Sequence, residues 1–178
     1  MFCFVAFLRG INVGGHTVAK EILREVFESL GFQNVFTYKQ SGNIIFEADC
    51  TDYKEIESRI EKKLSVALSF KVATFVRTFS QLNEIINLDP FKNQSIDNAS
   101  FLVTFLPMAI ANFPLQLPLI IPKSTAVVLS AARTEVFSVT HGGGEGALPN
   151  PFLESKLKLK ATTRNMNTIR EIIKKYSQ

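Results

Sequence analysis

The residues best suited to chemistry begin in the stretch FLRGINVGG (residues 7–15). Arg9 follows an apolar run, and three glycines come within the next six residues. Backbone N–H groups in a strand-to-helix loop can meet an anion, and glycines let a ligand approach closely. Arg9 adds a forked, charged donor. The stretch predicts the ligand-binding residues Arg9, Asn12, Gly14 and Gly15; the alternative is a tight turn with Arg9 paired to a local carboxylate.

The glycine loop matches no standard nucleotide motif. It is neither G-x-G-x-x-G nor a Walker loop, which needs Lys-Ser/Thr after its last glycine. Here His16 and Thr17 follow. The loop therefore predicts a polar, anion-binding pocket and leaves the ligand's identity open.

A second polar group lies in KQSGNIIF (residues 39–46). Its glycine and apolar residues fit the third strand of an RNA-recognition motif, which has the order βαββαβ. Ser41 and Asn43 stand where base-stacking aromatic rings are needed. The match favours the fold and argues against RNA binding by stacking. Gln40, Ser41 and Asn43 are candidate pocket residues or, more simply, turn residues.

A third polar group, TTRNMNT (residues 162–168), precedes the final helix. Thr163 or Asn165 can cap that helix. Arg164 would then stand at the positive end of the helix dipole, where a cation is disfavoured. An anion there would resolve the mismatch, so Arg164, Asn165 and Asn167 are also predicted to bind the ligand.

The sequence shows no recognisable catalytic or metal site. His16 and His141 lie in glycine-flanked loops, and Cys3 and Cys50 are the only cysteines. No nucleophile stands in an elbow motif, and no metal-ligand spacing occurs. We predict no metal, and catalytic residues, cofactors and enzymatic activity stay open.

Residues 1–78 have the pattern of a split βαβ, or ferredoxin-like, unit. Apolar runs predict strands, and helical spacing with Gly31 and Asp52 as end signals predicts two helices. The predicted strands cover 3–8, 34–39, 44–47 and 72–76, and the predicted helices cover 22–30 and 52–68.

Residues 79–178 predict a second α+β subdomain, a degenerate copy of the first that ends in basic helices. Prolines limit any helix between its first two long strands. The expected elements are a helix over 80–88, strands over 101–106, 126–129 and 136–139, a helix starting at Asn150-Pro151, and a last helix over 166–176. The predicted class is α+β with antiparallel sheets.

Charge and composition bound the function classes. The chain has 178 residues, is 46% hydrophobic and carries a net charge of +4. Residues 151–178 alone carry +5, a segment that could meet phosphates or acidic partners. No run approaches the ~20 apolar residues of a membrane span, and the N-terminus lacks signal-peptide features. We expect a cytoplasmic protein without a membrane partner.

FLRGINVGG, LGFQNVFTYKQSGNIIF and TTRNMNT together resemble the bacterial family known as domain of unknown function 1697. The resemblance implies two linked ferredoxin-like subdomains and no established activity. The family's repeated polar positions correspond to Arg9, Gly10, Asn12, Gly14, Gly15, Tyr38, Ser41, Gly42, Asn43, Thr163, Arg164, Asn165 and Asn167. The chain departs from the family at Met166, where a tryptophan is usual, and at residues 144–147, where a Gly-Arg-Ser-Lys-like run is usual.

These observations predict binding of an anionic, phosphate-bearing small molecule or nucleotide in a cleft between the subdomains, with Arg9 and Arg164 neutralising its charge. One alternative is nucleic-acid binding through the basic C-terminal helices. Another is a protein-interaction scaffold that uses exposed sheet edges. The oligomeric state stays open.

Overall fold

The computed structural model describes residues 1–11, 17–39, 42–94, 98–141 and 148–176. The chain divides into two compact units, Met1–Leu82 and Asn83–Gln178. The division falls inside helix α3 (Phe79–Leu88), a few residues beyond the predicted end of the first subdomain. Each unit combines helices with an antiparallel sheet, which confirms the α+β class.

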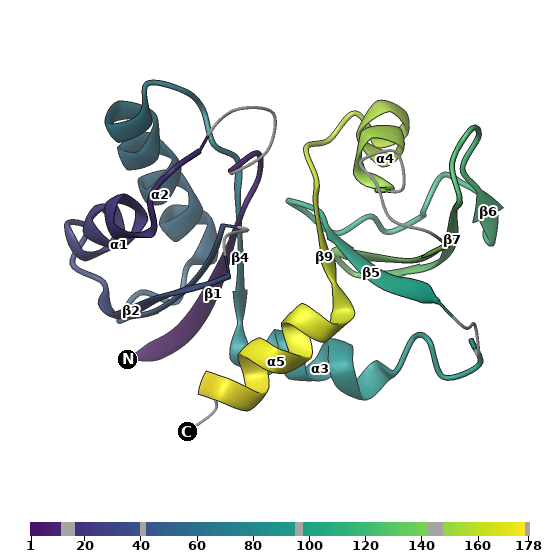
Figure 1. Cartoon of the computed structure of the whole chain (residues 1–178), viewed down its shortest axis with the longest axis horizontal. Coiled ribbons are helices and arrows are strands. Elements are labelled where there is room, and N and C mark those ends of the chain that lie inside the picture. The colour runs from purple at the N-terminus through teal and green to yellow at the C-terminus, as the bar shows by residue number, and fades with distance from the viewer. Residues whose placement is uncertain (12–16, 40–41, 95–97, 142–147, 177–178) are drawn as a thin grey trace. The chain divides into compact units, whose positions relative to one another are not determined.

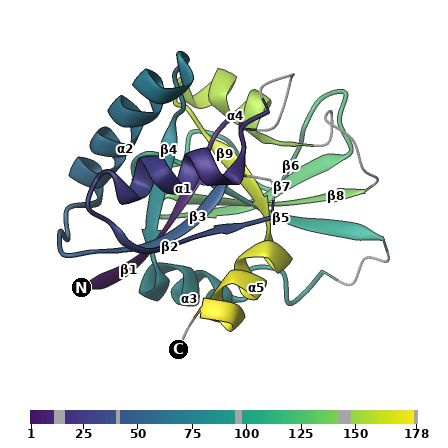
Figure 2. The ribbon, with the colours of Figure 1, turned by 60° about the vertical axis from the view of Figure 1, so that its left-hand side comes forward.

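The first unit contains β1 (Phe2–Leu8), α1 (Lys20–Glu28), β2 (Gln33–Tyr38), β3 (Asn43–Ala48), α2 (Tyr53–Leu68) and β4 (Thr74–Thr78). The strand order in its sheet is β2-β3-β1-β4, with antiparallel neighbours throughout. Helices α1 and α2 lie side by side on one face of this sheet (Figures 1 and 2). The helix and strand order is the one predicted.

The core of the first unit lies between these two helices and the sheet. Leu23, Val26 and Phe27 of α1 are buried there, and Phe27 meets Phe46 edge-on with ring centroids 5.3 Å apart. Ile22 was expected on the same apolar face but is 41% exposed. The helix presents an apolar stripe only about 100° wide, and Ile22 falls outside it.

Asp52 caps α2 as predicted. Its carboxylate accepts the backbone N–H groups of Lys54 at 2.9 Å and Glu55 at 3.2 Å. The spacing of Asp52 and Glu55 also predicts a capping box, in which Glu55 would reach back to the Asp52 N–H. The Glu55 carboxylate instead accepts from the Cys50 thiol at 3.7 Å. The cap therefore depends on Asp52.

The edge strand β4 has its outward backbone donors covered by side chains. The bonds run from Thr74 N–H to Glu61 (2.8 Å), from Val76 N–H to Glu57 (2.9 Å) and from Thr78 N–H to Gln81 (2.9 Å). Glu57 is buried and also accepts from the Lys54 ammonium at 2.8 Å. An edge strand with its N–H groups already bonded offers little to an added strand.

The second unit contains β5 (Ala99–Phe105), β6 (Leu119–Ile120), β7 (Ala126–Ala132), β8 (Glu135–His141), α4 (Asn150–Leu157), β9 (Thr162–Asn165) and α5 (Met166–Tyr176). Its strand order is β6-β7-β8-β5-β9. Strands β6 and β9 were not predicted, since the first is very short and the second is polar. Helix α4 lies over one face of this sheet and α5 over the other (Figure 1).

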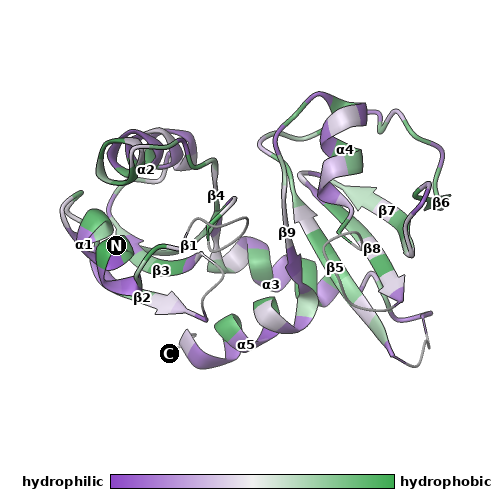
Figure 3. Cartoon of the chain, turned by 45° about the horizontal axis from the view of Figure 1, so that its top comes forward, coloured by the Kyte–Doolittle hydropathy of each residue, from purple (hydrophilic) through white to green (hydrophobic). Residues whose placement is uncertain are grey.

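Both faces of the second sheet are apolar. On the α4 face, Leu153 of the helix packs with Leu106, Val128 and Val136. On the other face, the Phe91 ring lies 4.8 Å from that of Phe101. Helix α5 buries Met166, Ile169, Ile172 and Ile173 as its spacing predicted, and it shows both hydrophobic and hydrophilic stretches in Figure 3.

Within the described part of the chain, no helix is long and apolar enough to cross a membrane.

The Asn150-Pro151 pair predicts Asn150 as the N-cap and Pro151 in the first turn, and the start of α4 differs from this by one residue. Pro149 occupies the N-cap position, and Asn150 is the first helical residue. The Asn150 side chain does not cap the helix. It accepts a hydrogen bond from the Thr163 hydroxyl at 3.3 Å and so ties α4 to β9.

Candidate functional site

The structure describes half of the predicted site residues. Arg9 and Asn43 belong to the first unit, and Arg164, Asn165 and Asn167 belong to the second. The others, Asn12, Gly14, Gly15, Gln40 and Ser41, lie outside the described residues. Each unit therefore has its own local geometry around the members it contains.

In the first unit, backbone pairing brings Arg9 next to the turn between β2 and β3. The Leu8 N–H donates to the Gly42 carbonyl at 2.8 Å, and the Arg9 N–H donates to the Ala73 carbonyl at 2.8 Å. Arg9 thus directly follows Leu8, which pairs with Gly42, while its own N–H pairs with the chain just before β4. The sequence motifs that contain Arg9 and Asn43 meet at one end of the sheet, because Asn43 pairs with Phe7.

Gly42 is required at this turn for two reasons. Its φ is +64°, in the region that favours glycine. A Cβ at this position would lie 3.0 Å from the Leu8 Cβ and 3.2 Å from the Ile11 Cβ. The turn can therefore approach the end of β1 only because residue 42 has no side chain.

Asn43 has a structural task within the same turn. It is 1% exposed, and its side-chain amide donates to the Tyr38 carbonyl at 3.2 Å. This bond closes the β2–β3 turn from inside. The geometry matches the turn-residue interpretation of Asn43, and a ligand contact by this side chain stays a prediction.

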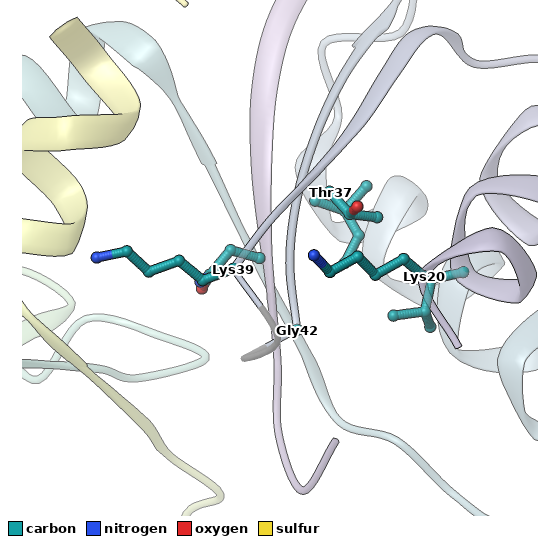
Figure 4. Close-up of a pocket in the computed structure, with 7 residues that line it drawn as sticks. Lys20, Thr37, Lys39 and Gly42 are labelled. Carbon is teal, nitrogen blue, oxygen red and sulfur yellow. The ribbon is translucent and has the colours of Figure 1, made fainter. Parts of the chain in front are cut away.

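Two lysines that are not among the predicted site residues lie near the β2–β3 turn. Lys20, Thr37, Lys39 and Gly42 line a shallow depression, too tight to hold a water molecule (Figure 4). The Lys20 ammonium points towards Thr37, whereas the Lys39 ammonium points away from both. The Lys39 ammonium lies 5.4 Å from the centre of the Tyr38 ring. Only the fold reveals this grouping, because residues 20 and 39 come from different elements.

The start of α1 contributes backbone dipoles to the same region. Its N-cap residue, Ala19, makes no side-chain hydrogen bond to the first turn, and Lys20 is the first helical residue. Helix N-termini carry partial positive charge and unsatisfied N–H donors. Lys20 adds a positive charge beside them, and Glu21 of the same turn adds a negative one, so the backbone donors are the feature that favours an anion here.

In the second unit, Arg164 lies in strand β9, opposite Val103 of β5. The final helix begins at Met166 as predicted, so Arg164 lies two residues before its first residue. That an anion offsets this cation near the helix start stays a prediction. The guanidinium donates to the Thr162 hydroxyl at 2.8 Å and to the Thr163 carbonyl at 2.9 Å.

Burial lowers the pKa of the Arg164 guanidinium to about 10. The group still keeps its charge at neutral pH, because the lowered pKa stays well above 7. A desolvated, charged guanidinium can bind an anion strongly. Arg164 therefore stays a candidate for ligand binding.

The neighbours of Arg164 have defined structural roles. Asn165 caps α5, since its side-chain oxygen accepts the Asn167 N–H at 2.9 Å, which confirms one of the two predicted caps. Thr163, the other candidate, bonds instead to the Thr104 hydroxyl at 2.8 Å. The polar residues of TTRNMNT are thus largely used to join β9, β5 and α5.

Acid–base and metal chemistry find no support among the described residues. Within these residues, no group of three or more His, Cys, Asp or Glu side chains could hold a metal ion. Burial, reinforced by Glu47, raises the pKa of the Cys3 thiol to about 11. Cys3 is therefore a protonated thiol at neutral pH, and the thiolate is the nucleophilic form.

Comparisons with known proteins identify a family and a fold. The family model described as "Protein of unknown function (DUF1697)" matches residues 1–116. A solved structure, that of conserved bacterial protein SP0830 from Streptococcus pneumoniae, matches with a TM-score of 0.66 and 20% identity, over 100% of this chain and 99% of that chain. No curated protein matches. These findings settle the family and the general fold, and they bring no ligand.

Proposed function

Because the chain belongs to the DUF1697 family of proteins of unknown function, we propose a function from its own geometry: it binds an anionic, phosphate-bearing small molecule or nucleotide. The binding surface in the first unit is formed by Arg9, Lys20, Lys39 and the start of α1. We call it the basic turn surface. The observation that carries the proposal is that Lys20, Lys39 and Gly42 line one depression, and that Gly42 pairs with Leu8, the residue before Arg9.

The chemistry of the basic turn surface suits phosphate. Arg9 offers a planar fork that can bind two phosphate oxygens at once, and the lysines act as point charges. The first turn of α1 adds backbone donors. The depression itself is too tight for a water molecule, so the ligand would lie on the surface with its charged end towards the cations. Arg164, Asn165 and Asn167 of the second unit stay predicted partners of this ligand.

Isothermal titration with pyrophosphate and with nucleoside di- and triphosphates tests the proposal. Arg9→Ala and Lys20→Ala should each weaken binding by about tenfold or more, since a hydrogen bond to a charged group contributes about 1.5–3 kcal/mol. Lys63→Ala, on the exposed side of α2, removes the same charge elsewhere in the first unit and should have little effect. Equal losses in all three variants would indicate a general charge effect instead. Absence of binding to every probe would count against the proposal.

Arg164→Ala tests the predicted contribution of the second unit. A loss like that of Arg9→Ala would support a ligand shared by both motifs. Normal affinity would limit the site to the basic turn surface. Because Arg164 donates to Thr162 and Thr163, the folded state of the variant must be checked by circular dichroism.

Nucleic-acid binding through α5 is the second candidate. Arg170, Lys174 and Lys175 are exposed on this helix, and the last two lie in its final turn. Binding of this kind weakens steeply as salt rises. A gel shift at low salt, with Lys174→Ala and Lys175→Ala combined as the variant, separates it from small-molecule binding. The third candidate is a protein-interaction scaffold that pairs with a partner strand through an exposed sheet edge. At β4 this is disfavoured, because side chains already accept its outward N–H groups.

We also propose that both units are variants of the ferredoxin-like plan, the second degenerate, in a cytoplasmic protein. The order β2-β3-β1-β4 in one sheet parallels β7-β8-β5-β9 in the other. A further parallel supports this relation: Glu57 of α2 accepts the Val76 N–H, and Glu154 of α4 accepts the Ala161 N–H at 2.8 Å. In both units, a glutamate of the helix accepts a backbone N–H from the chain that follows that helix. In the first unit the N–H lies in the edge strand itself, and in the second it belongs to the residue just before the edge strand.

A further inference from the structure

A cavity of about 210 Å³ lies in the second unit, between the β7–β8 hairpin and the segment that follows β5. Most of the residues that line it are hydrophobic: Leu106, Ile110, Ala111, Phe113, Ala131 and Ala132. Arg133 and Glu135, from the hairpin turn and the start of β8, complete the lining. An apolar cavity of about 150 Å³ can hold benzene, so this one has room for a single ring with a short substituent.

The cavity lies where the connections of the two units differ. In the first unit, the chain between the first two long strands contains α1, which covers the sheet. In the corresponding connection of the second unit, residues 106–118 contain Pro107, Pro114 and Pro118 and form no helix. The side chains of Ile110 and Phe113 from this segment pack against the core but are only half-buried. They therefore present apolar surface to the cavity, and a ligand that removes this surface from water gains binding energy.

Backbone hydrogen bonds hold the walls of the cavity in place before any ligand arrives. The Leu106 N–H donates to the Thr134 carbonyl at 2.8 Å, and the Ile110 N–H donates to the Arg133 carbonyl at 3.3 Å. These bonds attach the segment to the hairpin turn on either side of Pro107. A preformed cavity does not lose binding energy to ordering its walls.

The two charged residues of the lining already have partners within the second unit. The Glu135 carboxylate accepts the Thr134 hydroxyl at 2.6 Å, and the exposed Arg133 guanidinium forms an ion pair with Glu84. A charged ligand would lose its water shell in this cavity and would have to compete with these bonds for a partner. An uncharged ligand meets neither cost, so the cavity favours a neutral molecule.

We propose that this cavity binds a small neutral organic molecule: a single ring, or a branched chain of similar size, with an uncharged polar group at one end. The apolar body lies against Ile110, Phe113 and Ala131, and the polar group faces the solvent beside Arg133. An aromatic body gains an additional ring contact with Phe113. This ligand carries neither phosphate nor charge, and its site belongs to the other unit than the basic turn surface. The inference therefore does not rest on the proposed function.

Titration calorimetry with three probes of similar size tests the preference for a neutral ligand. We expect benzyl alcohol to bind, and benzylammonium and benzoate each to bind about tenfold or more weakly, because both ions lose hydration without gaining a partner. Equal or tighter binding of either ion would overturn the proposal, since a charged group of the lining would then select the ligand. Absence of benzyl alcohol binding would overturn it as well.

Two variants and a matched control locate the binding. Ala131→Leu fills the cavity and should abolish benzyl alcohol binding. Ala131→Val adds less volume, in a strand where β-branched residues are well tolerated, and should weaken binding about fivefold or more. Ala109→Leu makes the larger change at an exposed residue of the segment that does not line the cavity, and binding should persist. Normal binding by folded Ala131→Val would contradict the proposal even if Ala131→Leu failed to fold.

Discussion

The two units follow the same strand order but differ in what connects their first two long strands. In the first unit the connection contains α1, which covers the sheet with large apolar side chains. In the second it is a proline-containing segment with a cavity beneath it. The comparison teaches that the sheet order survives when a covering helix is replaced by an extended segment, whose side chains then pack on the sheet together with α4.

The largest expected effect on stability comes from removing a large side chain by which α1 covers the sheet of the first unit. Phe27 is fully buried and meets the rings of Phe46 and Phe32. Phe27→Ala should lower the free energy of unfolding by about 3–5 kcal/mol, because it leaves a cavity in a packed core. Urea unfolding followed by circular dichroism measures the loss.

Phe113→Ala is the matched change in the second unit. Phe113 is half-buried and already borders an open cavity, so we expect less than half of the loss seen for Phe27→Ala. Equal losses would break the comparison, since they would mean that the proline-containing segment covers its sheet as tightly as α1 does.

Gly42→Ala should have the next largest effect. The substitution places a side chain at positive φ and brings a Cβ within 3.0 Å of Leu8. We expect a loss of about 2–5 kcal/mol, the sum of the costs of the left-handed conformation and of the clash. Gly10→Ala is the control, because Gly10 has a φ of +76° but nothing within 4 Å of the added Cβ. Only the conformational cost of about 1–2 kcal/mol should appear there, in the same unfolding assay.

A further test compares the two units through the glutamates that bond at their edge strands. Glu57→Ala would leave the buried Val76 N–H without its acceptor, at a cost of about 1–3 kcal/mol. Glu154→Ala should cost less, since Glu154 is only half-buried whereas Glu57 is buried. Glu57→Gln keeps a side-chain oxygen and should recover most of the stability. Hydrogen exchange at Val76 and Ala161 reports the two bonds directly, and unchanged protection in both alanine variants would refute this role.

Much of the fold could be predicted because its signals are local. Neighbouring residues alone give the apolar runs of β1, β3 and β5 and the cap at Asp52. They also give the helical spacing of α1, α2 and α5. Strand β9 was missed, since Thr162–Asn165 is polar and resembles a helix cap; it pairs with β5, far away in the sequence. That tertiary pairing also places Arg164 in a strand, which its polar surroundings did not predict.

The candidate sites show the same limit. Arg9 and the Gly42 turn were found from glycine and charge patterns, which mark positions where the backbone bends. Lys20 and Lys39 were missed, because nothing in the sequence tells which lysines lie beside a turn formed by another segment. The cavity at Glu135 was missed as well, since prolines predict the absence of a helix but not the space left beneath the chain.

The smallest expected effect concerns the helix caps, where the two units should behave alike. Asp52 accepts two N–H groups of α2, and Asn165 accepts the Asn167 N–H of α5. Asp52→Ala and Asn165→Ala should each cost about 1 kcal/mol, the usual loss for a removed cap. Asn165→Asp keeps the acceptor and adds a charge favourable to the helix start, so it should match or exceed wild-type stability. If Asn165→Asp were as unstable as Asn165→Ala, the role of this side chain would lie in strand β9 rather than in α5. The cap would then no longer be a feature that the two units share.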